Sequence, residues 1–305
     1  MDKIPVILDT DIGTDIDDTW ALAMLLNCPE LDLRLITTVS GDTDYRAHLA
    51  AKFLQTADRT DIPIGIGLGN PEGSLNFQAE WLAGFDPIAY PGVIQPDGVN
   101  TLLEIVSKAE EPVTIISIGP ATNIANALEK APHIAKKCHF VGMYGSIYYG
   151  YNSTVGAELE ANVQQDVPSF RRVLSAAWEK IIITPLDTCG RVMLEGSRYQ
   201  QLFCSEDPIL KALIENYRIW SKRVTWMDVD YQETRSSILF DTVAVYLAYS
   251  HDLVEITSMN LRVTDNGITV PDPMGEKVMV ALNWRNLENF LDHLVERLGG
   301  TPPKN

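Results

Sequence analysis

Basic residues are scarce in this chain of 305 residues, which has 24 lysines and arginines against 41 aspartates and glutamates. The resulting net charge of -17 at pH 7 would repel nucleic-acid phosphates and anionic membrane surfaces, so neither is expected as a partner. A neutral small molecule or a cation suits this charge better.

Cysteines and long apolar runs are also scarce. The 4 cysteines lie far apart with no metal-binding spacing, so most are expected to be reduced, packed thiols. No apolar run approaches the roughly 20 residues that a membrane helix needs. The opening MDKIPVILDTD lacks the apolar core of a targeting segment. These absences predict a cytoplasmic protein that does not enter a membrane.

Short β-branched runs alternate with helical patterns along most of the chain. The expected strands are residues 6–8, 33–39, 62–67, 113–118, 139–143 and 181–184, and the expected helices are 19–26, 45–57, 99–109, 123–130 and 168–178. This alternation predicts an α/β fold with a mainly parallel central sheet flanked by helices. A hydrophobic content of 46% can bury one large core. We therefore expect a single domain over residues 1–299 and a disordered tail at 300–305.

Two aromatic stretches, residues 70–96 and 217–237, interrupt this alternation. Long insertions in an α/β frame often become the walls of a site. Plain packing against the outside of the core is an equally good interpretation of both stretches.

The segment DTDIGTDIDD, residues 9–18, gathers five aspartates directly after the apolar run at 5–8. In open parallel sheets, ligands bind beyond the carboxyl ends of the strands, where this segment would lie. Capping of the following helix would use one or two of the carboxylates. The remaining like charges must either protonate or recruit a cation. A divalent cation of the calcium or magnesium type, which prefers oxygen ligands, is the simplest solution.

Five segments resemble, in order, the signatures of the nucleoside hydrolase family, calcium-dependent enzymes that cleave N-ribosidic bonds. They are ILDTDIGTDIDDTWAL (7–22), TTVSGD (37–42), IGPATNIANAL (118–128), EANVQQDVPSFRRVL (160–174) and LFDTVAV (239–245). The first has two extra residues between Gly13 and Asp17 when compared with the family's DTDxGxDDAxAL. The resemblance implies the family's Rossmann-like fold and a homodimer or homotetramer.

The resemblance also implies a role for individual residues. Asp11 would ligate Ca²⁺ and act as the general base on a calcium-activated water. The other metal ligands would be Asp18, Asp241 and the backbone carbonyl of Ile118. The residues expected to bind the sugar or lie at its rim are Asp17, Asp42, Glu160 and Asn162. Asp9 is expected to orient the loop backbone, and Asp15 belongs to the two-residue insertion without an assigned role.

The leaving-group side departs from the family pattern. Phe240 stands where the family has a histidine, and Asp42 replaces an asparagine. None of the 5 histidines falls on a matched family position. Trp226, Tyr231 and Glu233 are candidates for stacking or proton donation, and a possible leaving-group pocket consists of Phe240, Trp226 and Tyr231. We therefore expect hydrolysis of a riboside whose leaving group differs from an ordinary purine.

Three alternatives stay open at this point. One is a hydrolase of a non-nucleoside glycoside, and another is a catalytically weak sugar-binding relative that keeps the metal site. The third is a haloacid-dehalogenase-type phosphatase, because VILDTDIGT resembles the DxDxT loop of that family. It is disfavoured because Thr14 follows Asp11 by three positions rather than two.

Overall fold

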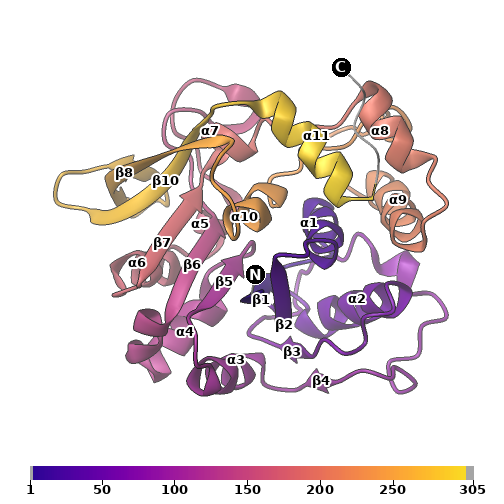
Figure 1. The fold of residues 1–305 in the computed structure, drawn as a ribbon, viewed down its shortest axis with the longest axis horizontal. Coiled ribbons are helices and arrows are strands. Elements are labelled where there is room, and N and C mark those ends of the chain that lie inside the picture. The colour runs from indigo at the N-terminus through magenta and orange to yellow at the C-terminus, as the bar shows by residue number, and fades with distance from the viewer. Residues whose placement is uncertain (1–2, 300–305) are drawn as a thin grey trace.

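The computed structural model describes residues 3–299, so the expected tail at 300–305 lies outside the described residues. A ten-stranded sheet crosses the molecule in the order β4-β3-β2-β1-β5-β6-β7-β10-β8-β9 (Figure 1). Its first seven strands, which all run parallel, are β1 (Ile4–Thr10), β2 (Leu31–Thr38), β3 (Ile64–Ile66), β4 (Ile94–Gln95), β5 (Val113–Ser117), β6 (Cys138–Met143) and β7 (Lys180–Thr184). The expected α/β class with a mainly parallel sheet is confirmed.

Helices cover both faces of the sheet, as the two hydrophobic cores show. On one face, Val6 and Leu8 of β1 pack with α1 (Asp17–Leu26), α2 (Thr43–Thr56), α8 (Gly196–Phe203), α9 (Pro208–Ser221), α10 (Thr242–Leu247) and α11 (Leu287–Arg297). On the other face, Ile7 packs with α3 (Gly98–Lys108), α4 (Thr122–Lys130) and α6 (Val167–Ser175). Because neighbouring β1 side chains alternate between faces and all three are fully buried, β1 lies at the centre of the fold.

The last part of the sheet was not predicted from the sequence. It consists of β8 (Val254–Val263), β9 (Thr269–Pro271) and β10 (Glu276–Trp284). β10 pairs parallel with β7, whereas β8 runs antiparallel to both β10 and β9. These strands form an arm that projects from the main body in Figure 1. β8 alternates buried with exposed positions and so lacks the apolar run that marks the central strands.

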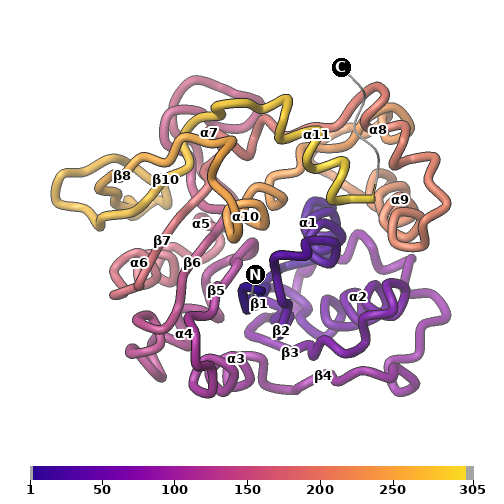
Figure 2. The backbone as a smooth tube through the Cα atoms, in the orientation of Figure 1, coloured from indigo at the N-terminus to yellow at the C-terminus, as the bar shows by residue number. Residues whose placement is uncertain are grey.

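The two aromatic stretches have different structures. Residues 70–96 are mostly loop, with one turn of 3₁₀ helix at η1 (Ala79–Leu82). In the second stretch, Tyr217 and Trp220 belong to α9 and are fully buried, so this part is core rather than loop. α9 packs against α1 and α2, which brings the second stretch beside the N-terminal part of the chain (Figure 2).

Three of the cysteines, Cys28, Cys138 and Cys189, are buried free thiols, whereas Cys204 is exposed. No helix within residues 3–299 combines the length and the apolar character that a membrane crossing demands.

Candidate active site

The acidic segment leaves β1 at the carboxyl edge of the parallel sheet and leads into α1. The end of β5, with Ile118 directly after it, lies beside β1, because the Ile118 N–H donates to the Asp9 carbonyl (2.8 Å). α10 packs against α1 and brings Asp241, the residue before its first turn, to the same place. Residues far apart in the sequence therefore meet at one edge of the sheet.

Three carboxylates converge at this edge. Asp17 and Asp18 are in the first turn of α1, and one oxygen of each lies within 4.8 Å of an oxygen of Asp241 and of the other. All three side chains are buried. Burial and the neighbouring carboxylates raise the pKa of each well above its usual value. The Thr10 hydroxyl donates a hydrogen bond to Asp18. Such a group can bind a cation or hold protons.

Asp11 is buried beside this group but is not one of the three converging carboxylates. Its carboxylate raises the pKa of Asp18, so the two charges interact. Burial raises the pKa of Asp11 itself, whereas the guanidinium of Arg46 lowers it. A buried carboxyl with a raised pKa is a stronger base than an exposed one, which suits the role that the sequence predicts for Asp11.

Asp9, near the end of β1, is hydrogen-bonded to neighbouring elements of the fold. Its Oδ1 accepts hydrogen bonds from the Thr37 hydroxyl (2.6 Å) and the Asn123 amide (2.7 Å), while Oδ2 is buried without a partner. Burial raises the pKa of Asp9 to about 7. These contacts join the ends of β1 and β2 to α4, and both partners are side chains rather than the loop backbone that Asp9 is expected to orient.

Asn162 contacts the backbone through its amide nitrogen. Nδ2 donates to the carbonyl of Ile118 and to that of Met143, both at 3.1 Å. Both N–H groups of the amide are thereby used, so Oδ1 is the atom with which Asn162 can receive a hydroxyl. The Ile118 carbonyl keeps a second lone pair for another partner.

Glu160 caps the short helix α5 (Ala161–Gln165). Its carboxylate accepts N–H groups from Gly145 (3.0 Å), Asn162 (2.7 Å) and Val163 (3.1 Å). Burial raises its pKa to about 7, against the lowering effect of these three donors. A carboxylate can accept about four hydrogen bonds, so one position is left for a ligand.

Asp42 caps α2 by accepting the Tyr45 N–H (3.0 Å), and its second oxygen accepts the Asn76 amide (3.3 Å). It thus links the end of β2 to the first aromatic stretch. It is not one of the three converging carboxylates.

The leaving-group candidates do not form one cluster but have different surroundings. Phe240 meets the ring of Tyr151 edge to face, with centroids 5.9 Å apart. Trp226 lies 5.5 Å from the ring of Phe77 and is 46% exposed. Tyr231 lies under the guanidinium of Arg235 (4.0 Å). Glu233 is exposed.

Asp15, in the two-residue insertion, is the residue of the acidic loop whose charge acts on two of the nearby tyrosines. Its carboxylate accepts the N–H of Ile16 (2.7 Å), and burial raises its pKa to about 6. Burial also raises the pKa of Tyr151 and of Tyr231, and the negative charge of Asp15 contributes to both shifts. Asp15 is therefore close enough to both tyrosines for its charge to act on them.

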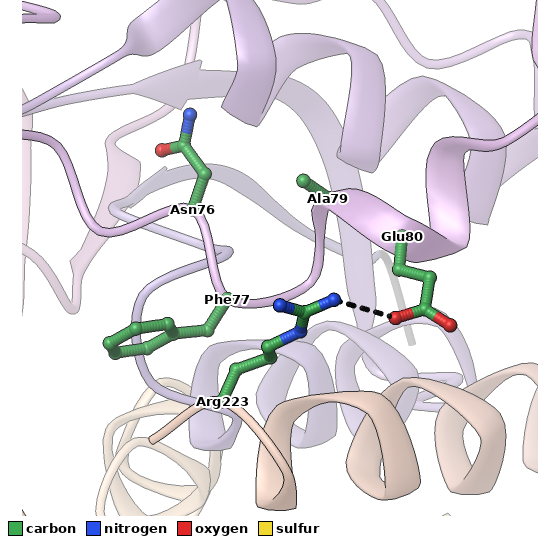
Figure 3. A pocket seen from close by; sticks show the side chains of 5 residues that line it. All are labelled: Asn76, Phe77, Ala79, Glu80 and Arg223. Carbon is green, nitrogen blue, oxygen red and sulfur yellow. Dashed lines mark hydrogen bonds and ion pairs between the residues drawn. The ribbon is translucent and has the colours of Figure 1, made fainter. Parts of the chain in front are cut away.

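A cavity of about 760 Å³ opens beside the acidic loop, lined by Asn76, Phe77, Ala79, Glu80 and Arg223 (Figure 3). Glu80 and Arg223 form an ion pair across it (3.2 Å). The Phe77 N–H donates to the Gly13 carbonyl (3.1 Å), which fixes the cavity wall to the loop. Both long aromatic stretches, predicted as either walls or packing, contribute to this cavity.

The backbone of the acidic loop is held by donors from three directions. The Gly13 carbonyl accepts the Tyr45 hydroxyl (3.2 Å), the Thr14 carbonyl accepts the Trp220 indole (3.1 Å), and the Asp15 carbonyl accepts the Gln78 amide (3.0 Å). Gly13 has φ +109°, and a Cβ there would lie 2.6 Å from the Tyr45 ring, so glycine is required.

The sequence pointed to the two stretches that carry Gln78 and Trp220, but it gave no sign of two further residues at the site, Arg46 and Tyr151. Their partners lie far away in the sequence, so no local spacing could reveal them. The density of aspartates did indicate that the loop needs hydrogen-bond donors and a positive charge from elsewhere in the chain, but not which residues supply them.

The sequence pattern of the inosine-uridine preferring nucleoside hydrolases matches residues 6–291. The chain belongs to this family. The resemblance seen in the five segments is confirmed, and so is the expectation of an N-glycosyl hydrolase enzyme.

Several relatives share most of their length with the chain. It is 26% identical over 284 residues to "Probable uridine nucleosidase 2" of Arabidopsis thaliana, covering 88% of this chain and 84% of the relative. It is 30% identical over 237 residues to the non-specific ribonucleoside hydrolase RihC of Salmonella paratyphi B, covering 72% and 74%. It is 27% identical over 222 residues to the pyrimidine-specific ribonucleoside hydrolase RihA of an Enterobacter species, covering 70% and 69%.

Solved structures share the fold. A plant nucleoside hydrolase superposes with a TM-score of 0.83 at 23% identity, over 99% of this chain and 100% of that one. A purine-preferring ribonucleoside hydrolase from Gardnerella vaginalis gives 0.77 at 21% identity, over 96% and 98%.

Proposed function

We propose that the protein hydrolyses the N-glycosidic bond of a ribonucleoside or a related riboside, with calcium held at the acidic loop. The observation that carries the proposal is the convergence of Asp17, Asp18 and Asp241 within 4.8 Å. Buried like charges at this separation repel one another unless they are protonated or neutralised by a cation. A divalent cation neutralises them at neutral pH without protonation.

The donor atoms at the site fit a hard cation. Asp11, Asp18 and Asp241 offer carboxylate oxygens, and Ile118 offers a carbonyl oxygen, which are the ligand types that calcium prefers. Asp17 belongs to the same converging group. We infer that it both contributes to the metal site and accepts a sugar hydroxyl, whereas the family resemblance alone implied the second role.

When bound, calcium would lower the pKa of a water and offer coordination positions to two vicinal hydroxyls of the sugar. The chain's own residues would do the rest. Asp11 would accept the proton of the attacking water, and burial raises the pKa of its carboxyl above the usual value, which makes it a stronger base. The fixed position of the sugar would stabilise a transition state with oxocarbenium character.

The sugar would be oriented by acceptors that still have a free position. Asn162 would use Oδ1, because both of its N–H groups are bound to backbone carbonyls. Glu160 would use its remaining carboxylate position, and Asp42 would contribute charge at the rim. These atoms lie on elements that are already fixed by hydrogen bonds, so little rearrangement is needed on binding.

The leaving group would be held by stacking rather than by a histidine. Phe240 with Tyr151, and Trp226 with Phe77, provide aromatic faces, and Tyr231 offers a hydroxyl. Aromatic faces accept any planar base, which agrees with an altered or broad preference. The names of two relatives, the pyrimidine-specific RihA and the probable uridine nucleosidase 2, make pyrimidine ribosides the first to test.

We further infer a cytoplasmic homodimer or homotetramer. The family resemblance supports the oligomer, and the acidic composition with few cysteines supports the location. Light scattering after size-exclusion chromatography measures the assembly, and a monomer at micromolar concentration would contradict it.

The deciding experiment is the release of reducing sugar from purine, pyrimidine and nicotinamide ribosides, with calcium present and after chelation. We expect release from at least one riboside, loss of release with the chelator, and recovery when calcium is restored. Calcium binding without release from the whole panel would favour a non-nucleoside glycoside or a sugar-binding role. Release that is insensitive to the chelator would contradict the metal mechanism.

A further inference from the structure

A buried arginine lies directly against the acidic loop. Arg46, in the first turn of α2, is only 3% exposed. Its guanidinium donates to the carbonyl of Asp11, to the carbonyl of Ile12 (2.9 Å), to the carbonyl of Ser40 (2.7 Å) and to the hydroxyl of Thr14 (2.9 Å). One side chain thereby contacts four residues of the site's framework.

These contacts join the two strand ends between which the loop is formed. Asp11, Ile12 and Thr14 follow β1, whereas Ser40 follows β2. Ser40 has φ +64°, a left-handed conformation that costs free energy for a residue with a Cβ atom. The hydrogen bond from Arg46 to its carbonyl helps to hold this conformation. Arg46 therefore connects the expected base, the loop residue Thr14 and the end of the neighbouring strand.

Charge and geometry predict opposite effects for this side chain. A permanent positive charge beside the carboxylates opposes the binding of a second cation, so its loss alone would strengthen calcium binding. A planar guanidinium that fixes three carbonyls and a hydroxyl keeps the carboxylates in place, so its loss would weaken calcium binding. Whether loss of the arginine strengthens or weakens calcium binding therefore distinguishes the effect of charge from the effect of geometry.

We propose that Arg46 is a positioning residue for the metal site, whose guanidinium holds the acidic loop and its insertion in the conformation that binds the ion. The effect on metal binding comes from the hydrogen bonds that the planar guanidinium donates rather than from its positive charge. This inference rests on the proposed function, because it takes calcium as the ion that the loop holds.

The test is calcium titration calorimetry on full-length protein stripped of metal, for the unmodified chain, Arg46→Lys, Arg46→Met and Arg46→Ala. Supporting residues at metal sites typically contribute about 10- to 100-fold in affinity. We expect weakening of this size in all three variants, because lysine keeps the charge but lacks the planar fork. Guanidinium ion at millimolar concentration should restore part of the affinity of Arg46→Ala, whereas methylammonium should not.

A surface arginine provides the matched control. Arg59 pairs with Asp61 on an exposed part of the chain, so Arg59→Met should leave calcium affinity within about twofold. Circular dichroism and the Tm of each metal-free variant show whether it folds. Should the Arg46 variants fail to fold, Thr14→Val removes one contact of the fork and should weaken calcium binding by roughly 3- to 10-fold.

The outcomes that overturn the inference are distinct from failure of the proposed function. Tighter binding in Arg46→Met, with Arg46→Lys unchanged, would show an effect of charge. Unchanged affinity in every folded variant, Thr14→Val included, would show that the loop holds its conformation without Arg46. Absence of calcium binding to the unmodified chain would instead contradict the proposed function, and this inference with it.

Discussion

The two sides of the site are built from different kinds of structure. On the metal side, Asp17, Asp18 and Asp241 are buried at the starts of packed helices. On the aromatic side, Trp226 is nearly half exposed and Tyr231 lies in an irregular segment. Helix ends that are fixed by a core keep ligand positions constant, whereas loops tolerate substitution. The metal residues match the family pattern and the leaving-group residues do not, but Phe240 departs from it although it directly precedes Asp241 at the start of α10, so exposure alone does not explain the departures.

The largest expected effect is on the metal side. Asp18→Ala should lower calcium affinity and riboside hydrolysis by more than about 100-fold, beyond what residues that merely support metal ligands contribute. Calorimetry and a reducing-sugar assay measure the two quantities. Asp61→Ala, which removes a surface carboxylate paired with Arg59, is the control and should change neither. Normal calcium affinity in Asp18→Ala would refute the alignment of the acidic motif.

The next prediction separates the two sides. Phe240→His restores the family's histidine beside Asp241 and should raise kcat on purine ribosides by about tenfold or more, since general acids contribute 10²–10⁴-fold where they are well placed. Calcium affinity should stay within about twofold. Phe203→His, on α8, introduces the same residue beside Tyr199 and serves as the control. A large loss of calcium affinity in Phe240→His would mean that the two sides are not independent.

The third prediction concerns stability on the metal side. Burial raises the pKa of Asp9 and of Glu160 to about 7 in the folded, metal-free protein, above their values of 3.8 and 4.5 when exposed. The folded state therefore binds more protons than the unfolded state between about pH 4 and pH 7, and the free energy of unfolding falls as pH rises through this window. Thermal scans in a chelator should give a lower Tm at pH 7.5 than at pH 5.5.

Calcium should offset much of this pH dependence near neutral pH, because it binds ionised carboxylates and its stabilisation of the folded state therefore grows as pH rises, reaching about 2.7 kcal/mol at 100 times its Kd. Glu160→Gln in the same scans should show a shallower fall of Tm with pH than the unmodified chain. A Tm that rises between pH 5.5 and 7.5 without metal would contradict the raised pKa values.

The smallest expected effect is on the aromatic side. Trp226→Ala should raise KM for the best riboside by about 2- to 10-fold, since an aromatic contact contributes about 0.5–1.5 kcal/mol. Calcium affinity and Tm should not change, because the ring is nearly half exposed. Trp284→Ala, in β10, is a useful contrast: this ring packs on Phe290, so its loss should lower Tm without a selective effect on KM. An unchanged KM in Trp226→Ala would remove this ring from the leaving-group pocket.

The central sheet and its helices could be predicted because each buried strand forms a continuous apolar run. In the β8–β10 arm, β8 could not be predicted, because polar residues interrupt it and its positions change between buried and exposed. The apolar run at residues 278–282 of β10 did carry a strand signal. At the site, the acidic segment could be predicted from its density of aspartates. The contact of Glu160 with the Gly145 N–H could not be predicted, because it joins residues 15 positions apart and depends on the folded loop. The burial of Arg46 could not be predicted either, because its partners follow two different strands.

The position of Asp241 has a consequence for how the protein is made. A nascent chain that ends before this residue already carries Asp17 and Asp18, but it lacks the third member of the converging group. It also lacks α10, which packs against α1 and carries that residue on its N-terminal end. During synthesis, the converging group of carboxylates is therefore complete only when the last quarter of the chain has been made, and the proposed calcium site can form only then.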